Sequence, residues 1–414
     1  MQYNNGENLK WSSLLSDFHC NNLELENIGK KEGMLAIDSI NLKNIQLNSG
    51  FLKKLQNITE VNTDFEVKQF TGSYADTTIK AKWFNAAFDR ITKTFSLDSV
   101  SYQPLLTRDS FLAKQAHQVD YITAKSGAVQ ISPVEINQFI NKNELSAGKV
   151  VINDFYFTDY KDKRLPFNAG IIKPLPAGLI KKMRSLIAID TVLLHNAAVE
   201  YTEIMTPSNT ALYVPVTRMN ARLLNLKNYK IKSGDSLSIQ STGYLLDTLW
   251  VKLKVIQSYT DSLEGFQMTL LGKPGDLRQL NPIFIPAASM KLESGQLDTL
   301  ILNVTGREYL AQGEMQLLYH NLKIRLLKDG DTSKKSFGGR IKNFIANSFV
   351  IKNRNKSRTT PVFFIRNRDK SAVNYLVKIV LTGFQASIGG KNPKKEMKKF
   401  RLELKKRQLP SIEQ

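Results

Sequence analysis

The residues that most often carry enzymatic or metal chemistry are few in this chain and are scattered along it. The 414 residues include four histidines and one cysteine. The histidines, His19, His117, His195 and His320, form no H-E-x-x-H pattern, and none is spaced from Cys20 as metal ligands are. We therefore expect surface or strand histidines, an unreactive Cys20, no metal site and no cofactor.

Catalytic loops and carboxylate pairs are not recognisable either. The sequence has no G-x-S-x-G elbow, no phosphate-binding P-loop and no dinucleotide-binding glycine pattern. A glycan-active enzyme would need two carboxylates that meet in space, and no such pair can be identified. The charged stretch from Asp159 to Arg164 is interpreted as a solvated hairpin connection between strands. These patterns predict a protein that is not an enzyme.

Positive charge is concentrated near the C-terminal end. The chain has 58 Lys and Arg against 37 Asp and Glu, and residues 334–407 alone hold 21 basic and 3 acidic residues. A nearly neutral body argues against a nucleic-acid partner, and the one aromatic and basic run, Phe363–Arg368, lacks the pattern of an RNA-binding sheet. The basic end predicts contact with an anionic membrane surface or an acidic partner, and a solvated tail is the alternative. The expected contact residues are Lys394, Lys395, Lys398 and Lys399.

Alternation of apolar and polar residues is the dominant structural signal and predicts a mainly β protein with short helices. A hexamer recurs at irregular intervals: an Ile or Leu, an Asp or Asn, a small or polar residue, then two apolar residues separated by one position. It appears at Ile37–Leu42, Leu97–Tyr102, Ile152–Phe157, Ile189–Leu194, Leu246–Val251 and Leu297–Leu302.

The fourth and sixth hexamer positions are predicted to share one apolar face, because alternate residues of a strand point to the same side. These candidate residues are Ile40, Leu42, Val100, Phe155, Phe157, Val192, Leu194, Leu249, Val251, Leu300 and Leu302. Such a face can line an open surface for acyl chains or fill a closed core. A two-layer sandwich is the alternative architecture.

Short helices are expected between the strands. Ser132 to Glu135 has the composition of a capping box with proline at the first helical position, and a second helix is predicted from Pro176 to Leu186. Pro274 to Pro286 predicts one helical turn followed by an extended segment. Two amphipathic segments follow, at Gly338–Asn347 and at Val373–Ile388, and the second is expected to cover the β structure or to lie in a lipid interface.

The expected organisation has three parts, with boundaries after residues 165 and 328. Residues 1–165 and 166–328 are predicted to be β repeats with short helices, and 329–414 a basic tail with two amphipathic helices. No apolar run is long enough for a membrane-spanning helix, and Met1 to Ser13 lacks the features of a secretory signal. The chain is expected to be cytosolic or to lack an upstream segment.

Several strand and turn motifs resemble the C-terminal region of AsmA-like envelope proteins, the group of the AsmA, TamB and YhdP types, in a form similar to Bacteroidetes members. The resemblance rests on the runs SMKLESGQLD at Ser289–Asp298, AQGEMQLLYHNLKI at Ala311–Ile324 and FFIRNRDKS at Phe363–Ser371. The strand ends YKDKRLP at Tyr160–Pro166 and AVEYTE at Ala198–Glu203 add to it. The resemblance covers most of the chain, from about Phe95 to Ser387.

The resemblance implies a long twisted β-sheet with an apolar inner face. With the residue patterns, we expect an elongated antiparallel sheet that forms an open apolar groove, closed at its C-terminal end by helices. It also implies a non-enzymatic lipid-handling protein of the Gram-negative envelope, in phospholipid transport or outer-membrane biogenesis. The implied location is the periplasmic face, with inner-membrane anchorage through a segment absent from this chain. Implied partners are phospholipid or another acyl lipid, a membrane surface and an outer-membrane protein. The alternative is a scaffold for outer-membrane proteins that binds no lipid.

Overall fold

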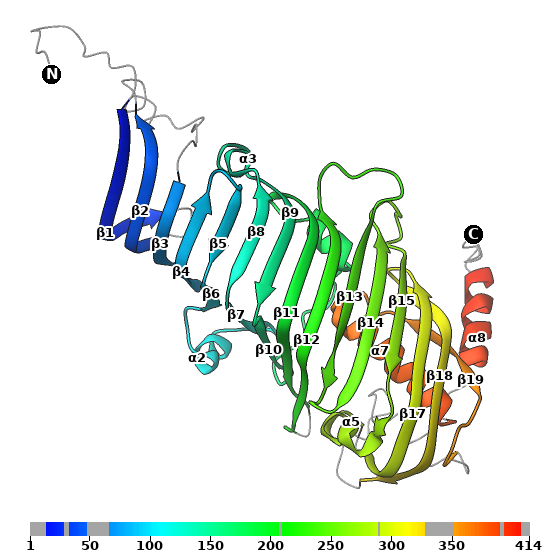
Figure 1. Ribbon diagram of the computed structural model, residues 1–414. Helices are drawn as coiled ribbons and strands as arrows, with labels where there is room; N and C mark the ends of the chain where they lie inside the picture. Colours follow the sequence, from blue (N-terminus) through cyan, green and yellow to red (C-terminus); the bar gives the residue numbers. More distant parts are fainter. Residues whose placement is uncertain are drawn as a thin grey trace, which may run out of the picture.

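The computed structural model describes most of the chain, and this part is mainly β. The described residues are 14–28, 33–47, 66–206, 209–288, 290–327, 352–389 and 393–406. Within them, 19 strands form one sheet, which is elongated and twisted (Figure 1). A single sheet, and not the two-layer sandwich, therefore organises these residues. The sheet continues across the predicted boundary after residue 165, and the domain boundaries stay predictions.

The strands follow one another across the sheet almost in chain order (Figure 1). Their bounds are β1 (Leu14–Ile28), β2 (Gly33–Leu47), β3 (Glu66–Ala75), β4 (Ile79–Asp89), β5 (Thr94–Leu97), β6 (Ser99–Pro104), β7 (Asp120–Ser126), β8 (Val129–Val134), β9 (Glu144–Asn153), β10 (Tyr156–Asp162), β11 (Leu186–Ile204), β12 (Ala211–Lys227), β13 (Ser236–Leu245), β14 (Leu249–Ser258), β15 (Phe266–Gly272), β16 (Gly275–Asp276), β17 (Met290–Gly306), β18 (Leu310–Leu326) and β19 (Thr359–Ile365).

The sheet is mixed, which corrects the prediction of a purely antiparallel one. Most neighbouring strands are antiparallel, but β9 and β10 both pair with β11 in parallel. A parallel pair needs a crossover connection, because the chain must return to the same end before the second strand starts. Residues 163–185 make this crossover, and they contain a short helix. Periodicity within single strands carries no information about this change of direction.

The recurring hexamers mark bends and turns of the strands. In three hexamers the second residue interrupts the regular strand. Asp98 separates β5 from β6, and the register between strands shifts at Asp38 and at Asp298. Bulges insert a residue and reverse the alternation, so the first and fourth positions of such a hexamer can face the same side. The hexamer at Leu246–Val251 instead contains the β13–β14 hairpin turn, where Leu246 and Asp247 have φ of 52° and 61°.

The helices at strand connections are short, and two longer helices lie near the C-terminus. They are α2 (Arg108–Ala113), α3 (Ile136–Lys142), α4 (Pro176–Lys181), η1 (Leu277–Leu280), α5 (Asn281–Ala288), α7 (Ala372–Ser387) and α8 (Pro393–Lys406). Two predictions about prolines are wrong. The run at Ser132 to Glu135 mostly continues strand β8, and α3 begins after it. Pro286 lies inside α5, where an extended segment was expected.

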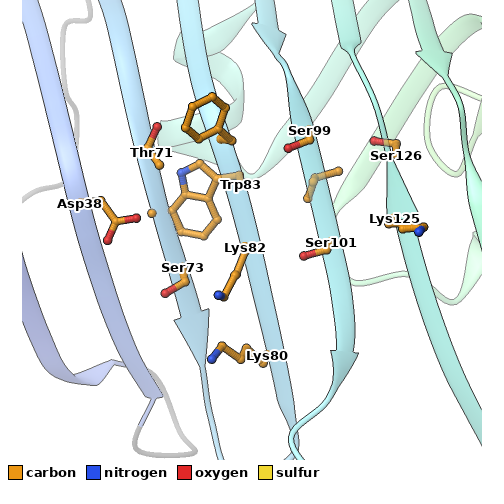
Figure 2. A pocket seen from close by; sticks show the side chains of 13 residues that line it. Asp38, Thr71, Ser73, Lys80, Lys82, Trp83, Ser99, Ser101, Lys125 and Ser126 are labelled. Carbon is orange, nitrogen blue, oxygen red and sulfur yellow. The ribbon is translucent and has the colours of Figure 1, made fainter.

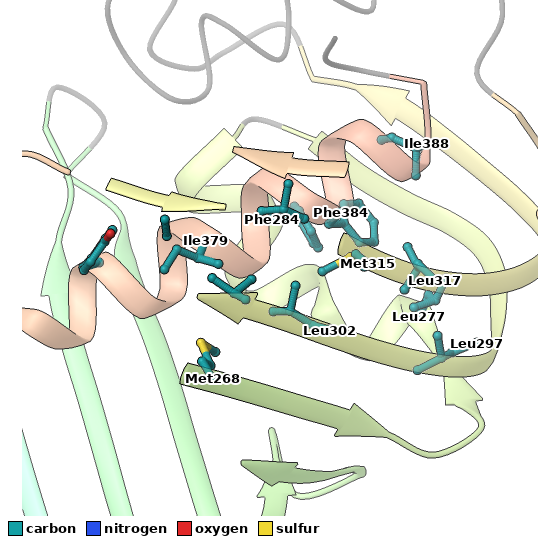
Figure 3. Close-up of a cluster of buried hydrophobic side chains, with 14 of the residues drawn as sticks. Met268, Leu277, Phe284, Leu297, Leu302, Met315, Leu317, Ile379, Phe384 and Ile388 are labelled. Atoms are coloured by element: carbon teal, nitrogen blue, oxygen red, sulfur yellow. The ribbon is translucent and has the colours of Figure 1, made fainter. Parts of the chain in front are cut away.

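Helix α7 confirms the prediction of an amphipathic helix that covers the β structure. Its buried side chains, including Tyr375, Ile379 and Phe384, join the main apolar core with residues of β14, β15, β17, β18 and β19. Figure 3 shows Ile379 and Phe384 among the side chains of Met315, Leu302 and Met268. We call the sheet face against which α7 packs the inner face. The segment Gly338–Asn347 lies outside the described residues.

Candidate functional site

A continuous row of apolar residues crosses the inner face from the first strand to the last. Each member is the direct cross-strand partner of the next, and the row passes through all strands except β6, β7, β10 and β16. We call this the main row: Phe18, Leu42, Val67, Phe88, Phe95, Ile131, Val150, Val192, Leu223, Ile239, Val255, Met268, Val304, Gly313 and Val362. With strands about 4.8 Å apart, it is roughly 65 Å long.

A second apolar row runs beside the main row over the N-terminal and central strands. It consists of Leu25, Leu35, Tyr74, Ala81, Tyr102, Ala124, Phe157, Val199, Val216, Leu245 and Leu249. Two such rows make a broad apolar band instead of a single seam. Because cross-strand neighbours lie within contact distance, each row also stabilises the pairing of its strands.

The predicted apolar face is brought together by these pairings. Leu42 and Val192 belong to the main row, and Phe157 and Leu249 to the second row. The other seven lie at same-face positions beside these rows: Ile40, Val100, Phe155, Leu194, Val251, Leu300 and Leu302. Most are partly buried, whereas Leu302 is fully buried under α7.

Exposure along the main row is highest at β1 and is uneven beyond it, since Phe88 on β4 is already only 5% exposed. Phe18 is 46% exposed, whereas Met268 is 3% exposed and Val362 is completely buried. At the C-terminal end α7 covers the row, with Tyr375 packed edge-on against Phe266 at 5.7 Å between ring centroids. The central residues Val150 and Val192 are buried mainly by neighbouring side chains of the sheet itself. The same face is therefore a covered core at one end and accessible at the other.

The crossover connection runs over the inner face. We call residues 163–175, which join β10 to α4, the strap. At its start the Lys163 amide donates to the Ile204 carbonyl, 3.2 Å away, and at its end the Leu175 amide donates to Glu264, 2.9 Å away. Leu175 is buried in the main core. The strap therefore joins the ends of β10 and β11 to the β14–β15 connection.

A charged cluster lies where the strap leaves the sheet. Lys161 forms an ion pair with Asp120 across the strand, at 2.5 Å. Lys163 pairs with Glu203, which also accepts a hydrogen bond from the Tyr201 hydroxyl. We call Asp120, Asp159, Lys161, Lys163, Tyr201, Glu203, Lys173 and Lys370 the rim cluster. Its sheet residues are same-face neighbours in register, because Asp159 pairs with Tyr201 and Lys161 with Glu203.

Burial and neighbouring charges change the acid–base properties of this cluster. Burial, with the nearby Asp120 carboxylate, raises the pKa of Asp159 to about 6. Burial and the charge of Glu203 also raise the pKa of Tyr201, so its hydroxyl stays protonated. Burial lowers the pKa of Lys370, and the positive charges of Lys163 and Lys161 lower it further. The cluster therefore holds charges that water does not fully solvate.

The rim cluster corrects the interpretation of Asp159 to Arg164 as a solvated hairpin connection. Tyr156–Asp162 is strand β10, and Asp162 is only 6% exposed while it accepts hydrogen bonds from the Arg164 side chain. The partners come from β7, β11 and the segment before α7, which are distant in sequence. Only the high density of charge in this stretch could have indicated a site.

The opposite face of the sheet carries polar residues over β4, β6 and β7. Lys82 pairs across the strands with Ser101, and Ser101 pairs with Lys125. These residues, with Asp38, Thr71, Ser73 and Lys80, line a depression of about 590 Å³ over β2 to β7 (Figure 2). The apolar residues Trp83, Phe84 and Val100 line it as well. A sheet with one apolar and one polar face is expected when only one face is packed or bound.

The lysines predicted to touch an anionic surface belong to α8. Lys394, Lys395 and Lys398 are exposed, and the side chain of Lys399 lies outside the described residues. The helix packs against β19 through Phe400 and Phe363, whose ring centroids are 5.7 Å apart. The lysine side chains are therefore carried by a helix that is attached to the last strand.

No metal or catalytic constellation is found in the part of the chain that the structure describes. No three His, Cys, Asp or Glu side chains there are placed to hold a metal ion. The four histidines are exposed, as predicted, and His320 pairs with Asp298 at 3.0 Å. No helix within the described ranges is long and apolar enough to span a membrane.

No protein-family model matches the chain, and no curated protein does.

Proposed function

We propose that this protein binds the acyl chains of lipids along the inner face of its sheet, as a non-enzymatic lipid-handling component of a Gram-negative envelope. The observation that carries the proposal is the unbroken main row. A sheet that needed only a core would not require apolar residues that remain partly exposed over so many strands. In this proposal the accessible part of the inner face forms an open apolar groove, and α7 closes its C-terminal end.

The energetics of such binding are adequate without a polar anchor. Each CH₂ group withdrawn from water contributes about 0.8 kcal/mol, so a sixteen-carbon chain gains roughly 10 kcal/mol before ordering costs. The rows provide same-face apolar side chains at the spacing of adjacent strands. An acyl chain can therefore lie across many strands while exposing little apolar surface.

The cellular setting is part of the same proposal and is supported by the resemblance to AsmA-like proteins. We propose the periplasmic face of the envelope as the location, with phospholipid or another acyl lipid as the ligand. The exposed lysines of α8 would contact anionic lipid heads or an acidic partner such as an outer-membrane protein. The basic character of this helix supports that contact, because anionic surfaces attract clustered lysines.

Native mass spectrometry tests lipid binding on protein made in a Gram-negative host and purified without detergent. The informative variants are Phe155→Asp and Leu194→Asp, which place a carboxylate on the inner face away from α7. Leu193→Asp is the matched control, because Leu193 is adjacent in β11 and points to the opposite face. Circular dichroism and thermal unfolding must first show that all three remain folded.

We expect bound phospholipid in the wild type and in the folded control, and less in the two inner-face variants. Lipid loss in the control alone would contradict binding on the inner face. A lipid-free wild type that also fails to load from vesicles would overturn the proposal. The scaffold alternative would then be preferred, since it needs the sheet but no ligand.

A further inference from the structure

We propose that the rim cluster binds the zwitterionic head group of the lipid, with its phosphate on Lys173 and Lys370 and its primary ammonium on Asp159. The inference rests on the proposed function and names the ligand class more narrowly. The chemistry required is that of a phosphoethanolamine head: an anion and a hydrogen-bond-donating cation separated by a short linker.

The acidic half of the site is Asp159. Its Oδ1 atom is buried and has no hydrogen-bond partner among the described residues. A buried carboxylate oxygen without a donor is costly, and a charge-assisted hydrogen bond from an ammonium group would remove that cost. On the neighbouring strands, the Asp120 carboxylate of β7 already forms an ion pair with Lys161, and the Glu203 carboxylate of β11 forms one with Lys163. Asp159 is therefore the acid of this cluster that can accept an additional cation.

The basic half consists of two lysines brought by different segments. Lys173 lies near the end of the strap, where its amide donates to the Arg368 carbonyl at 2.9 Å. Lys370 lies in the turn before α7, with its ammonium 3.1 Å from the ring centroid of Phe167. Neither forms an ion pair with a carboxylate among the described residues, although Lys173 lies within electrostatic range of Asp159 and Lys370 within range of Glu203. Lys161 and Lys163 lie within electrostatic range of Lys370, so an anion bound here would reduce repulsion between like charges.

Arg366 connects the two segments that carry Lys173 and Lys370. The Arg366 guanidinium is buried and donates to the carbonyl oxygens of Lys173, Glu308 and Lys370. A single side chain thus ties the strap to the turn before α7 and to the β17–β18 hairpin. Both lysines that would bind the phosphate are positioned by the same buried group, as a preorganised anion site requires.

The apolar rows lead directly to the rim cluster. Phe157 of the second row is two residues before Asp159 on β10, so both side chains point to the inner face. Phe155 lies one step further along the same face and stacks on Phe157 at 6.4 Å between ring centroids. A lipid whose head occupies the rim cluster would therefore place the start of its acyl chains on these two rings.

The site chemistry predicts a preference among phospholipids. A phosphocholine head carries a quaternary ammonium that cannot donate a hydrogen bond to Asp159, and a phosphoglycerol head has no cation. Only the phosphoethanolamine head can make a charge-assisted hydrogen bond to Asp159. This bond should favour its binding over the other two head groups by about tenfold or more.

The test is a competition experiment by native mass spectrometry. Vesicles contain phosphatidylethanolamine, phosphatidylglycerol and phosphatidylcholine in equal amounts, all with the same acyl chains. The protein variants are the wild type, Asp159→Asn and the double variant Lys173→Gln/Lys370→Gln. Asp109→Asn is the control, because Asp109 is an exposed acid on α2 with no place in the cluster.

We expect the wild type and Asp109→Asn to prefer phosphatidylethanolamine by about tenfold. Asp159→Asn should lose the preference while still binding phospholipid, and the double variant should bind less of all three. Equal binding of the three lipids by the wild type would overturn this inference and leave the proposed function standing. Failure of the wild type to bind any lipid would overturn both.

Discussion

Asp159 and Asp162 lie three residues apart on β10 and have pKa shifts in opposite directions. Burial and the nearby Asp120 charge raise the pKa of Asp159 to about 6, whereas hydrogen bonds from Arg164 lower the pKa of Asp162. For Asp159 the folded chain binds its proton more tightly than the unfolded chain does. Its carboxylate therefore lowers the free energy of unfolding once the pH rises above the unfolded value near 4.

We predict that Asp159→Asn becomes progressively more stable than the wild type between pH 4 and pH 7. The expected increase in this difference is about 1.5 kcal/mol, half of the unscreened value, because the carboxylate remains partly in contact with solvent. Urea unfolding at several pH values in this range measures it. Asp162→Asn serves as the comparison with the opposite sign, since it should lose stability at neutral pH and lose less in acid. A constant difference for Asp159→Asn would show that its carboxylate is solvated.

Sequence patterns predicted the strands and the apolar face because both depend on neighbours within one strand. The hexamers are a clear example. The polar second position belongs to the predicted repeat, and in the structure it marks a bend, as at Asp98 and Asp298. The main row could not be predicted, since it depends on the register between strands. Neither could the rim cluster, whose members Asp120, Lys163 and Glu203 come together through a parallel crossover.

Helix α7 lies close to β18 and β19 at Gly383. A Cβ atom there would lie 2.5 Å from Met315 Cε and 3.1 Å from Val362 Cγ2. Gly383→Leu should therefore push the helix away from β18 and β19, at a cost of about 1–3 kcal/mol for overpacking. The expected result is faster hydrogen exchange across residues 372–388.

The matched control for this prediction is Val377→Leu on the same helix. Val377 is 48% exposed, so a larger side chain there meets solvent and should leave exchange unchanged. Equal exchange in Gly383→Leu and Val377→Leu would mean that the sheet accommodates the new side chain and that α7 docking does not depend on a close approach.

At the scale of the whole molecule, the sheet has its core at one end. The main core cluster is built from β14 to β19, α7 and the short helices near them, whereas apolar residues of β1, such as Phe18 and Leu25, are largely exposed. Each strand contacts mainly its immediate neighbours along the sheet. In this respect the sheet resembles a repeat protein. The free energy of unfolding of such a protein is approximately a sum of contributions from neighbouring units, and local unfolding can start at the less stable end.

This asymmetry predicts a gradient of hydrogen exchange along the sheet. Amides of β17 and β18 should exchange orders of magnitude more slowly than those of β1 to β3, because only the former are buried beneath α7. Met315→Ala should accelerate exchange in β17 to β19 by removing about 2–5 kcal/mol of buried contact, and should leave β1 to β4 unchanged. Mass spectrometry of peptides from the intact chain measures both effects.

A single exchange rate for all strands, changed everywhere by Met315→Ala, would show that the sheet opens as one cooperative unit. In that case the exposed end could not accept a ligand by local opening, and binding would have to occur on the folded face as it stands.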